Sequence, residues 1–415
     1  MRGIKNIFKI SIAWTLVIAQ SCIEEIQPPS IEQTESLLVV DARISDRPIN
    51  QEIILSRSFQ LEEEPVFETG AEVFLEGSSG IRFNFLETQP GTYVSESALV
   101  INPSEGYSLN ITLSDGSSFG SEQEFLPRKV EIGDIEFKRE FNGFDEEGVG
   151  IYVKNSSTNG DPNFFRYEYE ETYKIIAPNW DPFEFDVVRY EPCFPDPFVV
   201  EIKPRVEETK TCYASYSSRD IILASTEDQV ENEIVKSIRF LSRDNYIISH
   251  RYSILVNQYS QSVDAFSFYE SLDDFSSSDL VFSQVQPGLI DGNISAKNNS
   301  SVDVIGFFEL SSFSSKRVYF NYEDLFPGEE LPPYAVNCET VGNPRLWPEA
   351  YHCFAEGICD GNCNSPLIDQ ILAGTLVFAA EKEDDFLSPF FTLPSPCGDC
   401  TKLGSNVVPE FWSEE

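Results

Sequence analysis

Two cysteines near the C-terminus, Cys397 and Cys400 in the stretch PCGDC, are the residues best suited to chemistry. A Cys-x-x-Cys pair can hold zinc, exchange electrons or form structural disulfides. Redox exchange needs a thioredoxin-like strand and helix around the motif, and this stretch offers neither. Zinc needs further ligands, but the nearby cysteines follow the irregular spacing Cys-x5-Cys-x3-Cys beside His352. We therefore predict structural disulfides and no metal site, with zinc binding as the competing hypothesis.

The number of cysteines supports the same prediction. Cys22 has a separate role, discussed below, and an even number remains, which in an exported chain indicates paired disulfides. Cys193 and Cys212 stand apart from the others, so we expect these two to bond to each other. The spacing does not decide how the other six are connected: Cys338, Cys353, Cys359, Cys363, Cys397 and Cys400.

Other catalytic patterns in the sequence are weak. The two histidines, His250 and His352, do not form a His-Glu-x-x-His motif, and the glycine-rich phosphate-binding motifs do not occur. A Gly-x-Ser-x-Gly pattern spans residues 116–120 around Ser118, but it follows an alternating strand as a hairpin turn and opens no helix. We therefore predict a non-enzymatic protein without catalytic residues or cofactor. A hydrolase that uses two of the 69 acidic residues is the enzymatic alternative.

The aromatic segment over residues 179–198 is the best candidate contact surface. Trp180, Phe183 and Phe185 stand among acidic residues and prolines in a predicted loop. Exposed loop aromatics often bind partners. The alternative is that they fold back as a small core under a loop closed by Cys193.

The N-terminal residues 1–21 are predicted to be a lipoprotein signal peptide. They begin with basic residues and continue with an apolar run over residues 10–19, which is too short to span a bilayer. Small residues then precede Cys22, an order that resembles a bacterial lipoprotein signal. We expect Cys22 to become the lipidated N-terminus and to anchor the chain in a membrane, because each buried acyl methylene contributes about 0.8 kcal/mol.

Residues 22–35 are predicted to form an acidic tether. Glu24 and Glu25, directly after the anchor, resemble the export tag of surface lipoproteins of Bacteroidota. The leader carries three basic residues and no acid, so 26 basic and 69 acidic residues remain, a formal charge of −43. Such a surface repels phosphate backbones, and nucleic acid is therefore excluded as an expected partner.

The elements that must position these residues are mostly strands. The stretch YSLNITLSDG alternates strictly, with Tyr107, Leu109 and Ile111 on one face and a predicted hairpin turn at Asp115-Gly116. Similar runs begin near residue 37 and recur between turns. We therefore predict a β-sandwich, Ig-like or transthyretin-like, over residues 36–127.

Residues 128–415 are predicted to form a larger β-rich domain with a disulfide-stapled C-terminal region. Strands are expected over residues 163–176 and 247–260, and a further strand pair at 302–312 and 316–323. In the first, Arg166, Glu168 and Glu170 share a face that we expect to be solvated. One or two helices are expected, at residues 260–275 and 370–381.

Several stretches in this order resemble a known family. They are LLVVDARISD, GAEVFLE, GTYVSES, YSILVNQYS, PGLIDGNIS with VIGFFELSS, and CGDC followed by VVPEFW. Together they resemble a lipoprotein family of Bacteroidota known as domain of unknown function 4249. Members are expected outer-membrane lipoproteins whose genes commonly neighbour TonB-dependent transporters. The resemblance supplies no catalytic residues.

Three functions are compatible with these features. The expected one is a non-enzymatic outer-membrane lipoprotein, facing the cell exterior, that is an accessory or binding partner of a TonB-dependent transporter. A structural or adhesive surface protein would have the same tether and stapled β architecture. A hydrolase with carboxylate catalysis is the third alternative.

Overall fold

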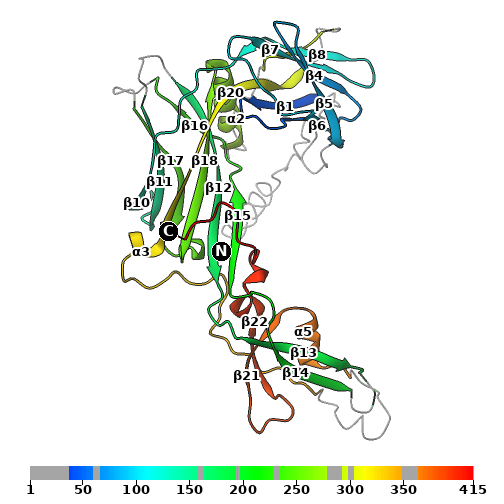
Figure 1. Cartoon of the computed structure of the whole chain (residues 1–415), viewed down its shortest axis with the longest axis vertical. Coiled ribbons are helices and arrows are strands. Elements are labelled where there is room, and N and C mark those ends of the chain that lie inside the picture. The colour runs from blue at the N-terminus through cyan, green and yellow to red at the C-terminus, as the bar shows by residue number, and fades with distance from the viewer. Residues whose placement is uncertain are drawn as a thin grey trace, which may run out of the picture.

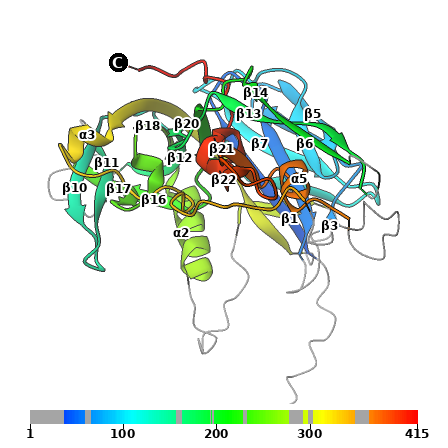
Figure 2. The ribbon, with the colours of Figure 1, turned by 90° about the horizontal axis from the view of Figure 1, so that it is seen from below.

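The computed structural model describes residues 37–58, 66–156, 163–192, 194, 197–227, 233–277, 292–297, 303–347 and 363–414. The protein is mostly β, which confirms the predicted fold class. Figure 1 shows three parts, which we call the rolled sheet, the central sandwich and the stapled lobe; the rolled sheet lies beside the upper end of the sandwich and the lobe lies below it. Seen from the stapled-lobe end, the sandwich lies to one side and the rolled sheet to the other (Figure 2).

The rolled sheet contains the N-terminal strands. Its order is β20-β1-β2-β6-β5-β4-β7-β8-β19, with β3 and β9 paired to β2 and β7. Alternate residues of each strand point inward, as predicted, and one continuous core results. The strands are β1 (Leu38–Ser45), β2 (Glu52–Arg57), β3 (Val66–Phe67), β4 (Glu72–Gly77), β5 (Arg82–Gln89), β6 (Thr92–Ser95), β7 (Gly106–Thr112), β8 (Ser118–Ser121), β9 (Glu124–Phe125) and β19 (Ile294–Ala296).

A seam of polar and glycine contacts closes this sheet between β19 and β20. The side chain of Asn293 accepts a hydrogen bond from Phe308 N at 2.8 Å and donates one to Phe308 O at 3.0 Å. A Cβ on Gly292 would lie 1.8 Å from the Gly306 carbonyl oxygen, and Gly306 itself has φ +140°. Only glycine permits this close approach and this backbone conformation. The first part of the molecule therefore depends on residues far along the chain.

The central sandwich packs two sheets face to face. One sheet has the order β15-β12-β18-β20, with β16 paired to β12, and the other has the order β10-β11-β17. Apolar side chains of both inner faces form its core, including Ile151, Tyr167, Tyr252 and Phe320. The strands are β10 (Asp134–Phe141), β11 (Glu147–Ser156), β12 (Phe164–Ile176), β15 (Thr211–Ser217), β16 (Ile222–Ser225), β17 (Glu233–Ser242) and β18 (Arg251–Gln261).

One long strand, β20 (Val304–Asn321), joins these two parts. Its first half lies parallel to β1, with Leu38 opposite Val304, and its second half lies antiparallel to β18, with Ser260 opposite Ser312. The predicted strand pair at 302–312 and 316–323 is therefore wrong. The two stretches belong to one continuous strand, which changes its pairing partner at Ser311 and Ser312 without a turn. The helix predicted over residues 260–275 is confirmed as α2 (Val263–Ser277), whose Phe268 packs on Phe307 of β20.

The stapled lobe combines the described residues of two distant segments, 178–206 and 336–398. It holds the hairpin β13 (Phe183–Tyr190) and β14 (Phe198–Pro204), the helix α5 (Pro366–Leu372) and the hairpin β21 (Leu376–Glu381) and β22 (Phe390–Pro394). The helix expected over residues 370–381 is wrong: α5 ends at Leu372, and Gly374, at φ +67°, turns the chain into β21.

Four short helices complete the described structure: α3 (Tyr322–Leu325), α6 (Ser395–Gly398), η1 (Tyr246–Ile248) and η2 (Cys400–Lys402). Within the described ranges, no helix has both the length and the apolar character needed to cross a bilayer.

Candidate functional site

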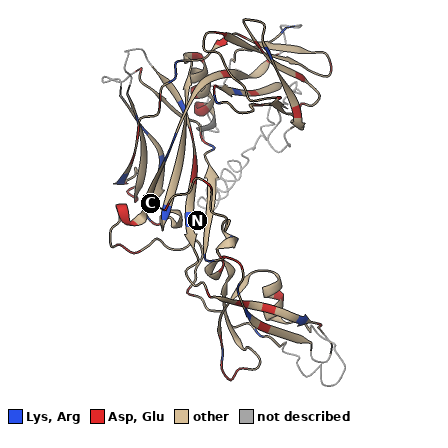
Figure 3. Ribbon diagram, in the orientation of Figure 1, with Lys and Arg blue, Asp and Glu red and all other residues tan. Residues whose placement is uncertain are grey.

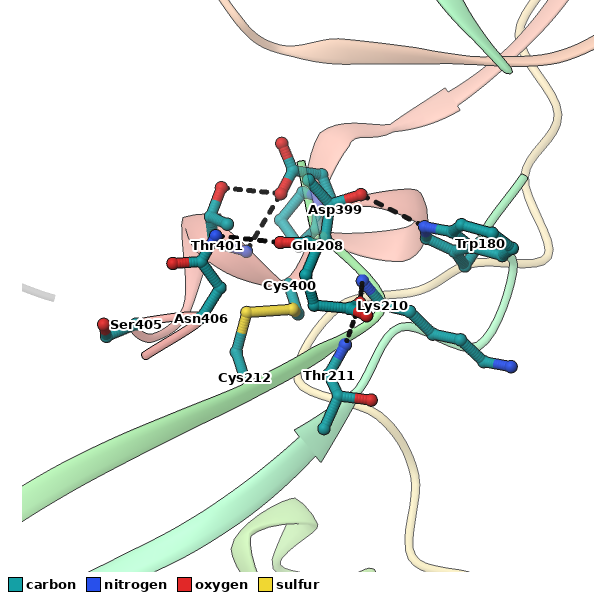
Figure 4. Close-up of a disulfide and its surroundings, with 12 residues drawn as sticks. Trp180, Glu208, Lys210, Thr211, Cys212, Asp399, Cys400, Thr401, Ser405 and Asn406 are labelled. Atoms are coloured by element: carbon teal, nitrogen blue, oxygen red, sulfur yellow. Dashed lines mark hydrogen bonds between the residues drawn. A yellow bond between two sulfur atoms is a disulfide. The ribbon is translucent and has the colours of Figure 1, made fainter. Parts of the chain in front are cut away.

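The neck between the sandwich and the stapled lobe holds the first of the predicted site residues. Cys212, at the start of β15, is bonded to Cys400 in η2, 188 residues away in sequence (Figure 4). Both cysteines are fully buried. The predicted bond between Cys193 and Cys212 is therefore wrong. Closeness in sequence does not decide the partner, because the fold brings the segment around Cys400 back to β15. Cys193 lies outside the described residues.

A second disulfide lies inside the stapled lobe. Cys397 in α6 is bonded to Cys338, and Cys363 is disulfide-bonded as well. The Cys-x-x-Cys motif therefore serves two partners: one sulfur fixes the lobe to the sandwich and the other closes the lobe on itself. Neither sulfur is a thiolate available to a metal in this form. Cys353, Cys359 and His352 lie outside the described residues.

The local sequence explains how the motif turns between its two bonds. The side chain of Asp399 accepts a hydrogen bond from Thr401 N at 2.9 Å and caps η2 (Figure 4). Gly398 contacts Val377 and the carbonyl of Asn179, where a Cβ would lie 2.9 and 3.3 Å from them. Small and capping residues between the cysteines thus let the chain pass tightly through the neck.

The three predicted contact aromatics do not form one surface. Trp180 donates from Nε1 to Thr209 Oγ1 at 3.1 Å and packs with the apolar residues around the neck disulfide (Figure 4). Phe185 lies in β13 between Phe378 and Phe390, with ring centroids 5.6 and 5.3 Å away. Phe183 is 43% exposed. Within the segment predicted as a loop, Phe183–Tyr190 form the strand β13, which supports the small core of the lobe.

Two other residues considered for chemistry have structural surroundings. Ser118 is the first residue of β8 and lies opposite Thr112, directly after the turn of an antiparallel hairpin, and the next described element is the strand β9. His250 lies directly before β18 and is half-buried. Burial lowers the pKa of His250, and the ammonium of Lys174 lowers it further.

A cluster of charged residues that no sequence motif indicates lies where the rolled sheet meets the sandwich. We call it the charged corner, and it alternates acid and base. Arg43 donates to both oxygens of Asp41 at 2.8 Å, and Glu168 accepts from Arg43 at 3.3 Å and from Arg166 at 2.5 Å. A further pair joins Arg166 to Glu309 at 3.3 Å. Because Asp41, Arg43 and Glu309 belong to the rolled sheet and the other two to β12, the cluster connects the two parts.

Burial makes this cluster unusual. The side chain of Glu309 is 0% exposed and that of Arg166 is 5% exposed. Arg166 also stacks 4.4 Å above the ring of Tyr259 and 5.4 Å from that of Tyr269. Although burial lowers the pKa of Arg166, the carboxylate of Glu309 raises it, and the net shift is upward. The expectation of a solvated face on β12 therefore fails at Arg166, which α2 and the rolled sheet cover.

A pocket of about 240 Å³ opens beside the charged corner, between β1, β2 and the outer face of β12 and β18. Arg47 and Glu52 stand at its rim, and Arg47 lies 5.1 Å above the ring of Phe313. The only sequence signal for this site was the alternation of opposite charges on one strand face. Residues that are 125 positions apart, such as Arg43 and Glu168, carry no local sign of their contact.

This architecture belongs to a known family. The family described as domain of unknown function (DUF4249) matches residues 23–317, and the chain is a member of it, as the resemblance predicted. The matched range includes both halves of the seam and the charged corner and ends within β20, before the Cys-x-x-Cys motif. No curated protein matches the chain.

Proposed function

We propose that this protein is an exported lipoprotein of the outer membrane, anchored through acyl chains on Cys22 and facing the cell exterior. We propose further that it acts by binding, without catalysis, as a partner of a TonB-dependent transporter. The signal-like residues 1–21 and the position of Cys22 directly after them support the anchor.

The neck disulfide is the main structural evidence for the proposed export. Cys212 and Cys400 are buried together at the base of a separate lobe, and such bonds form and persist in oxidising compartments. By the chain-entropy account, a bond across 188 residues stabilises the fold by about 5 kcal/mol. A protein that depends on such a bond is suited to the extracytoplasmic side of the membrane.

Shape and charge support a binding role. The three parts form an elongated body (Figure 1), and acidic residues lie on all of them (Figure 3). The resemblance described above implies a neighbouring TonB-dependent transporter, and an elongated, tethered body can reach such a partner. An adhesive or structural role uses the same features and is the alternative outcome of the test below.

Anchoring is tested by metabolic labelling with a radioactive fatty acid. We expect the wild-type protein to be labelled and membrane-bound, and Cys22→Ser to be unlabelled and released. Cleavage by protease added to intact cells tests exposure. An unlabelled wild-type protein, or full protection from protease until the cells are lysed, would contradict the proposal.

Partnership is tested by a pull-down of the tagged protein from its own outer membrane in mild detergent, read by mass spectrometry. We expect a TonB-dependent transporter in an amount comparable to the bait. An unrelated tagged lipoprotein of the same membrane is the control. Recovery of the protein without a transporter would remove the transporter role and leave the adhesive or structural one.

A further inference from the structure

We propose that a groove at the base of the sandwich binds a small amphipathic carboxylate, a ligand with an apolar body and one anionic group. The groove is built from the ends of β12 and β18, from α3 and from the chain around residues 331–334. This site is independent of the anchor and of the transporter partnership.

The groove consists of two adjoining pockets with a common wall. Their volumes are about 320 and 260 Å³, and both are lined by Lys174, His250 and Leu331. The first pocket has a mixed lining and holds the charged groups of Arg251, Glu323 and Glu414, so we call it the polar pocket. The second is apolar. A ligand that spans both would therefore need one charged end and one hydrophobic end.

The apolar pocket presents ring and aliphatic surfaces. The residues that form these surfaces are Pro178, Tyr246, Pro332 and Tyr334. The hydroxyl of Tyr334 donates to the carbonyl of Pro396 at 3.0 Å, and that of Tyr246 lies 3.2 Å from the hydroxyl of Tyr173. Because the hydroxyls are engaged elsewhere, the tyrosines offer mainly their rings to an occupant. Burial of an apolar body against these rings would supply most of the affinity.

The polar pocket already receives a carboxylate from the chain itself. Lys174 Nζ lies 3.0 Å from both carboxylate oxygens of Glu414, near the C-terminus. The same carboxylate also accepts hydrogen bonds from Trp412 Nε1 at 3.1 Å and from the hydroxyl of Tyr213 at 3.4 Å. Two contacts hold the tail without this carboxylate: the ring of Trp412 packs on that of Tyr213 at 4.9 Å, and Tyr319 donates to Phe411 O at 2.5 Å. Since the Glu414 side chain is 55% exposed, the carboxylate of a ligand can replace it without removing the tail.

His250 is the second polar group that faces the occupant. Its imidazole has no hydrogen-bond partner among the described residues, although the residue is half-buried in the wall between the two pockets. The charged groups around it are Lys174 on β12, Arg251 on β18, Glu323 on α3 and Glu414 on the tail. A neutral imidazole N–H can donate to a carboxylate beside Lys174, and the ligand would satisfy this group.

The test uses 4-phenylbutyrate as probe and 4-phenylbutyramide as its uncharged control, with the mature full-length protein and titration calorimetry. We expect 4-phenylbutyrate to bind at one site with a dissociation constant of about 1 mM or below, which is within the affinity that a ligand with so few non-hydrogen atoms can reach. Removing the ionic contact by Lys174→Met should weaken binding about tenfold. Lys382→Met, which removes a similarly exposed lysine paired with Asp385 in the stapled lobe, should have no effect.

A second variant separates loss of the site from loss of the fold. Glu414→Gln removes the competing carboxylate, so it should strengthen binding of 4-phenylbutyrate by about two- to fivefold. Misfolding cannot produce a gain of affinity. Equal binding of the acid and the amide, unchanged affinity in both variants, or no binding to the wild type and Glu414→Gln would each overturn the proposal.

Discussion

Among the described residues, the rolled sheet buries twenty apolar residues in one core, whereas the stapled lobe has two small clusters of three buried residues each. The rolled sheet contains no disulfide among its described residues and closes through a glycine and asparagine seam. The lobe is tied by Cys338–Cys397 within itself and by Cys212–Cys400 to the sandwich. Small units that cannot bury enough apolar surface are commonly held by disulfides. The comparison indicates that the two ends of the molecule respond to different perturbations.

The largest expected effect is the loss of the neck disulfide. Cys212→Ser combined with Cys400→Ser should destabilise the protein by about 4–5 kcal/mol. The loss should concentrate in β13 and β22, seen as lost hydrogen-exchange protection, while β7 stays protected. The bond between Cys338 and Cys397 spans only 59 residues, so its removal by the corresponding double variant should destabilise the protein less. Equal loss of protection in β7 would contradict this contrast between the two ends.

The next effect is expected at the charged corner. Arg166→Met leaves the fully buried carboxylate of Glu309 without its ion pair and should cost about 3–5 kcal/mol in urea unfolding. Arg166→Met with Glu309→Met removes both charges and should recover part of that loss. Because the cluster spans the rolled sheet and the sandwich, both should lose protection together. A double variant no more stable than Arg166→Met would contradict the ion-pair interpretation.

The seam offers a smaller and strictly local test. Gly306→Ala would place a Cβ 2.1 Å from the Val40 carbonyl oxygen at φ +140° and should cost about 2–3 kcal/mol. The matched control is Gly80→Ala, at φ +85° with no atom within 4 Å of the new Cβ, which should cost about 1 kcal/mol. Thermal unfolding measures both. If a reducing agent changed the loss of stability that Gly306→Ala causes, the stability of the seam would depend on the disulfides.

The smallest effect is expected at His250. Its pKa is lowered by burial and by Lys174, so between the folded value and the ordinary 6.5 the unfolded chain binds a proton that the folded chain does not. This contribution to stability is complete above pH 6.5 and is lost as the pH falls through that interval. His250→Gln should flatten the difference in stability between pH 7 and 5. Identical pH profiles of the variant and the wild type would refute it.

Local patterns predicted those elements whose stability comes from one alternating or periodic face. Tyr107, Leu109 and Ile111 are buried as predicted, and α2 has the predicted helical spacing. The strand β13 was missed because neighbouring prolines and acidic residues indicate a loop. Its partners in the core, Phe378 and Phe390, come from another part of the chain.

Contacts between distant segments were beyond the sequence patterns. The bond from Cys212 to Cys400 and the contact from Arg43 to Glu168 depend on how three parts meet, and nothing in the local spacing encodes this. The shared strand β20 is a further example. The serines in the middle of this strand are typical of a turn in sequence. In the structure, Ser311 and Ser312 lie where the strand stops pairing with β1 and begins to pair with β18.

The parallel pairing of β1 with β20 also has a mechanical consequence. β1 is the first strand of the rolled sheet, and its eight residues lie in register with eight residues of β20. Tension on the N-terminal side, directed along β1, would load these backbone contacts in shear and share the force among them. The same β20 continues into the sandwich, so the load would pass into a second sheet without crossing a flexible joint. A chain pulled from the N-terminal side of β1 would therefore resist detachment of that strand.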